Sequence, residues 1–276
     1  MSKLRIFSPA KVNLFFQVLG KRSDGYHEIA SVYQVIDLGD FLEFTPCFAD
    51  RLTSSDPTLP LDRSNLVLQA LTYLRKRIPH LPHFHVHLDK KIPLGSGLGG
   101  ASSNAATTLW ALNEWMGSPL SMQELAQIGG RIGADVPCFF STGLAYCRGK
   151  GENVTSLERL FSFRSTLALS GILSSTPAVY RQLSAADYST SLFPLEEFFS
   201  HPLYFNDLEK AAEGLQSKLS CYKKALIQGG FSTVSMSGSG SAYFCLGEGK
   251  SPSGVVMKPI QGIRREENGW YKESVR

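Results

Sequence analysis

The sequence predicts an α+β protein with two domains. Strand-like and helix-like segments both occur in the 276-residue chain, and 43% hydrophobic residues against 19% charged ones suffice for a substantial core. After Gly151 and Glu152 the composition becomes serine-rich and loop-prone before regular patterns resume. We therefore assign residues 1–158 to an N-terminal domain and residues 159–276 to a C-terminal domain.

The N-terminal half begins with β segments. Residues 4–19 have a strand pattern that Pro9 interrupts, and residues 31–45 predict a pair of strands around Gly39 and Asp40. An amphipathic helix follows, and then apolar and polar side chains alternate as in a strand. We expect that helix over residues 64–78 with Ser64 as its N-cap, and that strand over residues 84–92.

Two more helices complete this half. One covers residues 104–116, and the next follows Ser121 and Glu124, which have the spacing of a capping box, and ends at Gly129–Gly130. In the second half we expect a strand, two helical regions and a hairpin. These lie at residues 165–172, around Val179, at 206–227 and at 231–246.

Composition excludes several classes of protein. A net charge of +4 is only mildly basic, which permits an anionic ligand and does not indicate nucleic acid. Five scattered cysteines without a CxxC pair indicate neither a disulfide framework nor a zinc site, and they favour the reducing cytoplasm. The N-terminus lacks a cleavage signal and no apolar run approaches the roughly 20 residues of a membrane span, so we expect neither targeting nor a membrane partner.

A glycine-rich stretch, PLGSGLGGASSNAA from Pro93 to Ala106, is the strongest local signal. It contains four glycines, three serines and no charge. Without Cβ atoms, backbone N–H groups can approach a ligand closely, and the helix that follows has no acid in its first turn. With Ser102 or Ser103 as N-cap, an anion such as phosphate fits this helix start. The alternative is a mobile surface turn ahead of a buried helix.

Three common phosphate sites do not match. Gly95, Gly97 and Gly100 satisfy GxGxxG, but the acid expected at the end of the next strand is missing, since Glu114 lies within a helix. The stretch does not end in Gly-Lys-Ser/Thr as a Walker A loop does, and the sequence has no HRD or DFG triplet as in protein kinases. A different ATP loop remains.

The stretch resembles the ATP-binding motif of the GHMP kinases, the family of galactokinase, homoserine kinase and mevalonate kinase. Ala101 stands where relatives often carry serine, which leaves the backbone cradle intact. The motif SMSGSGSAYF, from Ser235 to Phe244, matches a second family motif in the expected order. The resemblance implies an N-terminal domain like the second domain of ribosomal protein S5 and a ferredoxin-like C-terminal domain, with the ligands in the cleft between them.

The same resemblance implies ATP as phosphoryl donor together with Mg²⁺, for which Ser103 is the candidate ligand. The residues that would bind ATP are those of the motif: Pro93, Leu94, Gly95, Ser96, Gly97, Leu98, Gly99, Gly100, Ala101, Ser102 and Ser103.

Further motifs are similar to one branch of this family. They are PAKVNL, GKR, DGYHE, IDLGD, IGADVPCFF and FNDLE. The members of this branch phosphorylate the 2-hydroxyl of 4-diphosphocytidyl-2-C-methyl-D-erythritol, a step of the non-mevalonate route to isoprenoid precursors. The resemblance is weakest over residues 156–202 and in the tail after Gly249.

Lys11 and Asp135 are the catalytic candidates under this resemblance. Asp135 would orient or deprotonate the acceptor hydroxyl, and Lys11 would hold Asp135 ionised and stabilise charge on the transferred group. From the residues alone, a strand lysine such as Lys11 is more often a solvated residue, and Asp135 is more often the cap of a short helix.

The candidate substrate-binding residues are Asn13, Tyr26, His27, Thr176 and Tyr180. Strand periodicity places Asn13 on the same face as Lys11. Tyr26 and His27 can offer an aromatic wall and a ring nitrogen to a cytosine base, and Tyr180 the second wall. Without the resemblance, Tyr26 and His27 are an ordinary hairpin tip.

Two further interpretations stay open at this point. His83, His85 and His87 lie on one strand face with a His-x-His spacing that zinc can use, although no clustered acid or cysteine supports a metal there. Instead of this kinase, the chain could be another GHMP kinase or an inactive nucleotide- or RNA-binding module. DGYHE argues against the first, and the presence of both Lys11 and Asp135 against the second.

Overall fold

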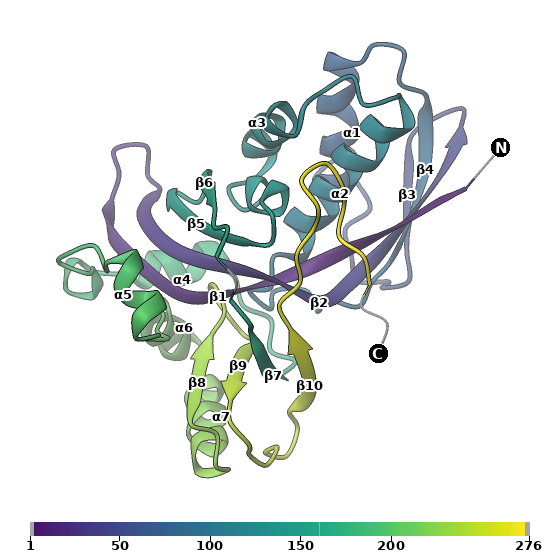
Figure 1. The fold of residues 1–276 in the computed structure, drawn as a ribbon. Coiled ribbons are helices and arrows are strands. Elements are labelled where there is room, and N and C mark those ends of the chain that lie inside the picture. The colour runs from purple at the N-terminus through teal and green to yellow at the C-terminus, as the bar shows by residue number, and fades with distance from the viewer. Residues whose placement is uncertain (1–2, 160, 274–276) are drawn as a thin grey trace.

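The computed structural model describes residues 3–159 and 161–273, and Figure 1 shows two sheets with helices packed on them. The first sheet has six strands in the order β3-β4-β2-β5-β6, with β1 paired to β2. Its strands are β1 (Leu4–Lys21), β2 (His27–Cys47), β3 (Arg51–Ser54), β4 (His83–Asp89), β5 (Leu144–Gly149) and β6 (Asn153–Ser156). All pairs are antiparallel except β3 with β4.

The two long strands β1 and β2 form the centre of this sheet. The expected pair of strands around Gly39 and Asp40 is wrong, because β2 runs through both residues without a turn. Gly39 lies opposite Pro9, where the pairing register shifts, and a Cβ atom there would lie 2.4 Å from the Phe7 ring. This glycine therefore permits close packing of a ring on the strand rather than a turn.

Three helices and a short 3₁₀ turn cover one side of this sheet in Figure 1. They are α1 (Leu66–Arg77), α2 (Gly100–Trp115), α3 (Met122–Ile132) and η1 (Pro137–Phe140). The capping box of Ser121 and Glu124 is confirmed. Asn65, and not Ser64, caps α1. The expected end of α3 at Gly129 is wrong, because this glycine lies inside the helix and packs against Val136.

The second sheet has the order β10-β7-β9-β8, and all its pairs are antiparallel. Its strands are β7 (Arg164–Leu169), β8 (Thr233–Met236), β9 (Tyr243–Leu246) and β10 (Val256–Gln261). The expected hairpin is confirmed as β8 and β9. The helical elements between β7 and β8 are α4 (Thr176–Gln182), η2 (Ala185–Asp187), α5 (Leu195–Ser200), α6 (Glu209–Leu215) and α7 (Ser217–Gln228).

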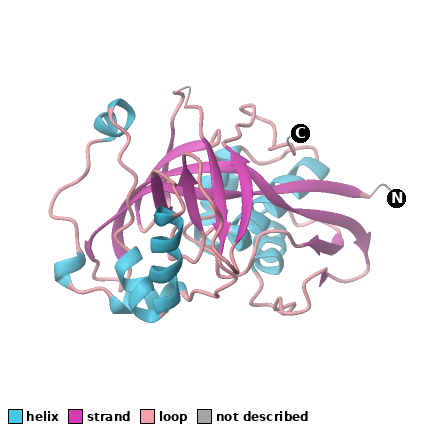
Figure 2. Ribbon diagram, turned by 90° about the horizontal axis from the view of Figure 1, so that it is seen from below, coloured by secondary structure: helices cyan, strands magenta, loops and turns pink. Residues whose placement is uncertain are grey.

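The helical region expected over residues 206–227 is two helices, because Gln216 adopts non-helical dihedral angles (φ −135°, ψ 80°) between α6 and α7. In Figure 2 the strands occupy the middle of the molecule, with helices on either side. The predicted α+β fold class is confirmed.

The C-terminal tail returns to the first sheet after β10, as its yellow trace in Figure 1 shows. The Trp270 indole Nε1 donates to the Phe7 carbonyl at 3.0 Å and its ring stacks on Trp110. The Arg265 guanidinium donates to the Ser141 carbonyl at 2.8 Å. The tail therefore stabilises the N-terminal core, and the boundary between residues 158 and 159 stays a prediction.

The three histidines of β4 share one strand face, and their ring nitrogens have protein partners. His85 and His87 both contact the Thr53 hydroxyl, at 2.8 and 2.9 Å, and His83 lies 3.2 Å from Asp50. No group of three or more metal-ligating side chains occurs within residues 3–159 and 161–273. In the same ranges, no helix is long and apolar enough to cross a bilayer.

Candidate active site

The glycine-rich stretch forms a loop between β4 and α2. Gly95, Gly97 and Gly99 have φ values of +58°, +75° and +70°, a conformation that only glycine adopts readily. The prediction that Ser102 or Ser103 caps the helix is wrong, because Gly99 is the N-cap and no side chain bonds there. With no acid in the first turn, the free N–H groups of α2 offer a site for an anion.

The second glycine-serine motif lies against this loop. The Ser237 hydroxyl donates to the Gly97 carbonyl at 3.0 Å, and the Ala242 N–H donates to the Ser96 carbonyl at 3.0 Å. A Cβ atom on Gly97 would lie 1.9 Å from the Ser237 carbonyl oxygen. The two motifs, about 140 residues apart in sequence, therefore shape one another, and a packed loop replaces the alternative of a mobile surface turn.

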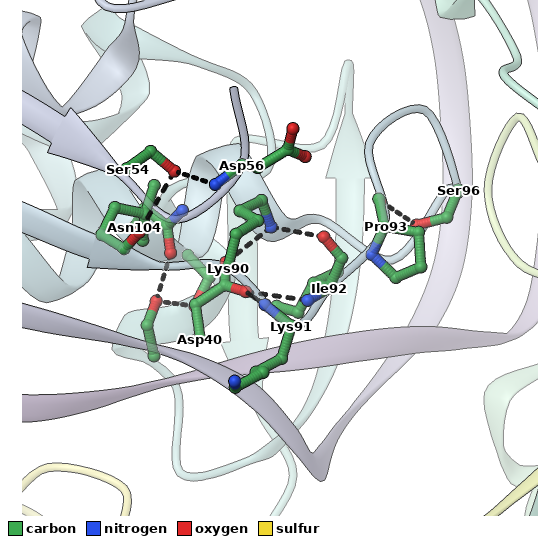
Figure 3. A network of polar contacts seen from close by, with 12 residues as sticks. Asp40, Ser54, Asp56, Lys90, Lys91, Ile92, Pro93, Ser96 and Asn104 are labelled. Carbon is green, nitrogen blue, oxygen red and sulfur yellow. Dashed lines mark hydrogen bonds and ion pairs between the residues drawn. The ribbon is translucent and has the colours of Figure 1, made fainter. Parts of the chain in front are cut away.

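A buried ion pair holds the entrance of the loop, as Figure 3 shows. The Asp40 carboxylate is 0% exposed and lies 2.7 Å from the Lys90 ammonium. Its other oxygen accepts from the N–H groups of Lys91 and Ile92, at 2.6 and 2.8 Å. Burial lowers the pKa of Lys90, and Asp40 opposes that shift. The chain is thus fixed directly before it turns into the loop.

Lys11 and Asp135 meet at the inner end of the loop. The Lys11 ammonium lies 3.6 Å from an Asp135 carboxylate oxygen and donates to the Asn13 side-chain oxygen at 2.7 Å. Lys11 is only 2% exposed, so it is not a solvated strand residue. Asp135 does not cap η1, whose N-cap is Val136 without a side-chain hydrogen bond.

Tyr33 is a partner of Asp135 that sequence reasoning missed. Its hydroxyl donates to the second carboxylate oxygen at 3.0 Å, and the Lys11 ammonium lies 4.8 Å from its ring centroid. Burial and then the charge of Asp135 raise the pKa of Tyr33 well above its usual value, so the hydroxyl keeps its proton and donates. Nothing in the buried strand pattern around Tyr33 distinguishes it from a core residue.

A ring pocket lies at the other end of the cavity. The rings of His27 and Tyr180 are 5.0 Å apart between centroids, and the Tyr188 hydroxyl lies 3.3 Å from His27 Nε2. Burial and then the charge of Lys21 lower the pKa of His27, so its ring is neutral at neutral pH. Tyr26 is 54% exposed, and the ammonium of Lys150 lies 4.4 Å from its ring centroid.

One cavity of about 730 Å³ joins these parts. It is lined by the loop from Pro93 to Ser102, by Lys11 and Asp135, and by Tyr26, His27, Thr176 and Tyr180. Two predicted site residues lie behind this lining. Asn13 supports Lys11 and donates to the Ser31 hydroxyl at 2.9 Å. The Ser103 hydroxyl faces that of Ser8 at 2.9 Å, whereas Ser102 lines the cavity.

Five lining residues with ionisable side chains were not predicted as site residues from the sequence: Tyr33, Lys90, Lys150, Lys21 and Arg181. Lys150 stands between two glycines in a turn, a pattern that also fits a solvated lysine. Thr176 bonds to the Ser239 hydroxyl at 2.7 Å, which ties α4 to the second glycine-serine motif.

Comparison with known proteins agrees with this geometry. The family described as GHMP kinases N terminal domain matches residues 65–143. A 4-diphosphocytidyl-2-C-methyl-D-erythritol kinase of Protochlamydia amoebophila is 46% identical over 271 residues, which are 98% of this chain and 94% of that protein. The chloroplastic kinase of the same name from Arabidopsis thaliana is 38% identical over 99% of this chain and 77% of its own length.

Comparison with solved structures leads to the same family. A crystal structure of 4-(cytidine 5'-diphospho)-2C-methyl-D-erythritol kinase superimposes with a TM-score of 0.77 at 30% identity, covering 94% of this chain and 99% of that one. A homoserine kinase from Cytophaga hutchinsonii shares the fold, with a TM-score of 0.68 at 17% identity over 97% and 96% of the two chains. This chain therefore belongs to the 4-diphosphocytidyl-2-C-methyl-D-erythritol kinases, a branch of the GHMP kinase family.

Proposed function

We propose that this chain transfers the γ-phosphoryl group of Mg²⁺-bound ATP to the 2-hydroxyl of 4-diphosphocytidyl-2-C-methyl-D-erythritol. The observation that carries the proposal is the position of Lys11 and Asp135. They lie in one cavity between an anion-binding loop and a pocket of aromatic rings. A phosphate donor at one end and a nucleoside-linked acceptor at the other would meet at this pair.

In this mechanism Asp135 accepts the proton of the attacking hydroxyl. The hydroxyl oxygen bonds to the γ-phosphorus as the bond to the β-phosphate oxygen breaks, and ADP leaves. Lys11 stabilises the charge on the transferred group, and Asn13 holds its ammonium in place. Tyr33 orients Asp135 by donating to the oxygen that does not face Lys11.

The oxygen ligands in the cavity fit a magnesium ion that is bound mainly by phosphate oxygens. Magnesium takes one or two carboxylates together with substrate phosphates and water. Among the described lining residues the cavity contains one carboxylate, Asp135, and Ser102 is the hydroxyl nearest the start of α2. Ser102 rather than Ser103 would supply a protein ligand. When bound, the ion would neutralise charge on the phosphates.

The ring pocket suits a cytosine base. The neutral His27 ring carries one donor and one acceptor, which can pair with the edge of a base. The Tyr180 ring lies 5.0 Å from that of His27 between centroids, tilted by 33°, and the exposed Tyr26 would form a second wall. Five unpaired cysteines among the described residues favour a reducing compartment, and we place the reaction in the cytoplasm.

Replacing His27 by alanine should raise the KM for the cytidylyl substrate by about tenfold or more, since a hydrogen bond and a ring contact to the base are lost. The KM for ATP should stay close to the wild-type value, because the loop that binds ATP lies at the other end of the cavity. Steady-state kinetics with each substrate varied in turn measure both constants.

His80→Ala, a change in an exposed residue outside the cavity, is the matched control. Equal increases in both KM values for His27→Ala would mean that this ring does not read the base.

The proposed function is tested by ADP release from Mg-ATP with a panel of acceptors. The panel contains 4-diphosphocytidyl-2-C-methyl-D-erythritol, the methylerythritol phosphate without its cytidylyl group, mevalonate, homoserine and galactose. We expect turnover with the first compound alone. Turnover with another acceptor would make the chain a different small-molecule kinase, and no turnover with any would indicate a binding module.

A further inference from the structure

Three positively charged side chains at the ring pocket form no ion pair with a carboxylate among the described residues. Lys21, Lys150 and Arg181 line the cavity, and none of them forms an ion pair within residues 3–159 and 161–273. The other two lining cations are paired, Lys11 with Asp135 and Lys90 with Asp40. The surplus of positive charge therefore lies at the acceptor end of the cavity.

The surplus of positive charge at this end of the cavity affects neighbouring groups. The charge of Lys21 contributes to the lowered pKa of His27, which Lys21 faces across the β1–β2 register. Like charges repel each other, and exposed charges are incompletely screened at 0.1 M salt when they lie within about 10 Å. An arrangement of this kind is stabilised when an anion of matching charge binds between the cations.

The three cations are not equivalent. The Lys150 ammonium already has a partner, because it lies over the Tyr26 ring, 4.4 Å from the ring centroid. Arg181 follows Tyr180 on α4, where residues four apart in sequence, Pro177 and Arg181, both face the cavity. Lys21 ends β1 beside His27. Lys21 and Arg181 thus flank the two rings from different elements.

We propose that Lys21 and Arg181 form a subsite for the diphosphate of the acceptor. The inference rests on the proposed function, since it takes the ring pocket as the base site. A guanidinium binds phosphate oxygens with two parallel N–H donors, and an ammonium adds a point charge. The triphosphate of ATP does not need these groups, because its site is the loop at the start of α2. The subsite distinguishes a cytidine diphosphate derivative from a bare cytidine.

The test measures binding of cytidine, CMP and CDP by calorimetry, with a non-hydrolysable ATP analogue filling the loop. The wild-type protein should bind CDP more tightly than CMP, and CMP more tightly than cytidine. Lys21→Gln and Arg181→Gln should each weaken CDP binding by about 10-fold or more, the range of a charge-assisted hydrogen bond, and leave cytidine binding nearly unchanged. Both residues are exposed, so the variants should fold.

Arg131→Gln, an exposed arginine outside the cavity, is the control and should change neither affinity. If the variants keep the wild-type preference for CDP over cytidine, or lose affinity for both equally, the diphosphate subsite is wrong and the proposed function stands. If the wild-type protein binds none of the three compounds, the base site itself is wrong, and the proposed function fails with it.

Discussion

Asp135→Asn should abolish turnover while ATP still binds. The amide matches the carboxylate in size and can still accept the hydrogen bond from Tyr33, which is 3.0 Å long in the wild-type protein. It cannot accept a proton from the acceptor hydroxyl, and it leaves Lys11 without its anionic partner at 3.6 Å. Loss of a positioned base typically costs about 100-fold to 10,000-fold in rate. We therefore expect kcat to fall by at least about 100-fold.

Nucleotide affinity should change little, because the backbone of the Pro93–Gly99 loop and the start of α2 provide the anion site. Single-turnover kinetics and titration with a non-hydrolysable ATP analogue measure the two effects separately. Asp62→Asn makes the same chemical change near the start of α1, outside the cavity, and should leave kcat at the wild-type value. Retention of more than a few per cent of wild-type kcat in Asp135→Asn would remove this residue from the mechanism.

Asp40→Asn should have the largest effect on stability. The side chain of Lys90 is 4% exposed, and the change leaves its ammonium buried without a counter-charge. Breaking a buried ion pair in this way costs about 3–5 kcal/mol of unfolding free energy. The amide keeps an oxygen for the N–H groups of Lys91 and Ile92 but loses the second acceptor. We also expect a higher KM for ATP, since these bonds fix the entrance of the loop.

Urea unfolding measures the loss of stability. When the variants and the wild-type protein have the same slope of unfolding free energy against urea concentration, the difference between their midpoints reports the difference in unfolding free energy. Glu196→Gln is the matched control, because it removes a carboxylate from an exposed pair with Arg159 and should cost much less. Adding Lys90→Met to Asp40→Asn should restore part of the stability, since no unpaired charge then stays buried. Equal losses for Asp40→Asn and Glu196→Gln would contradict the role given to the buried pair.

The parts of the site that the sequence predicted are those made of consecutive residues. The glycine pattern from Gly95 to Gly100 is visible in sequence because each position needs a backbone conformation or an approach that a side chain would block. The capping box of α3 and the β8–β9 hairpin are local in the same sense, and both are confirmed. Helix boundaries at Ser64 and at Ser102 or Ser103 were wrong by a few residues, because a neighbouring residue, Asn65 or Gly99, makes the cap.

Other members of the site could not be predicted, because their roles depend on residues far away in the chain. Tyr33 acts on Asp135, which lies 102 residues further on, and Asp40 on Lys90, 50 residues further on. In sequence the first has the pattern of a buried strand residue and the second that of a turn residue. No local sequence pattern predicted where the C-terminal tail lies, because its position depends on Trp270 packing against Trp110.

By itself, the sequence determined the α+β class and the phosphate loop, because these depend on backbone conformation and local periodicity, whereas Lys11 and Asp135 were singled out only by the resemblance to a family. Only the tertiary structure decided that the two glycine-serine motifs touch through Ser237 and Gly97, and that Lys11 and Asp135 lie between the loop and the His27–Tyr180 pocket. The physical reason is that distances, burial and unpaired charge belong to the packed chain, and no single segment of the sequence carries them.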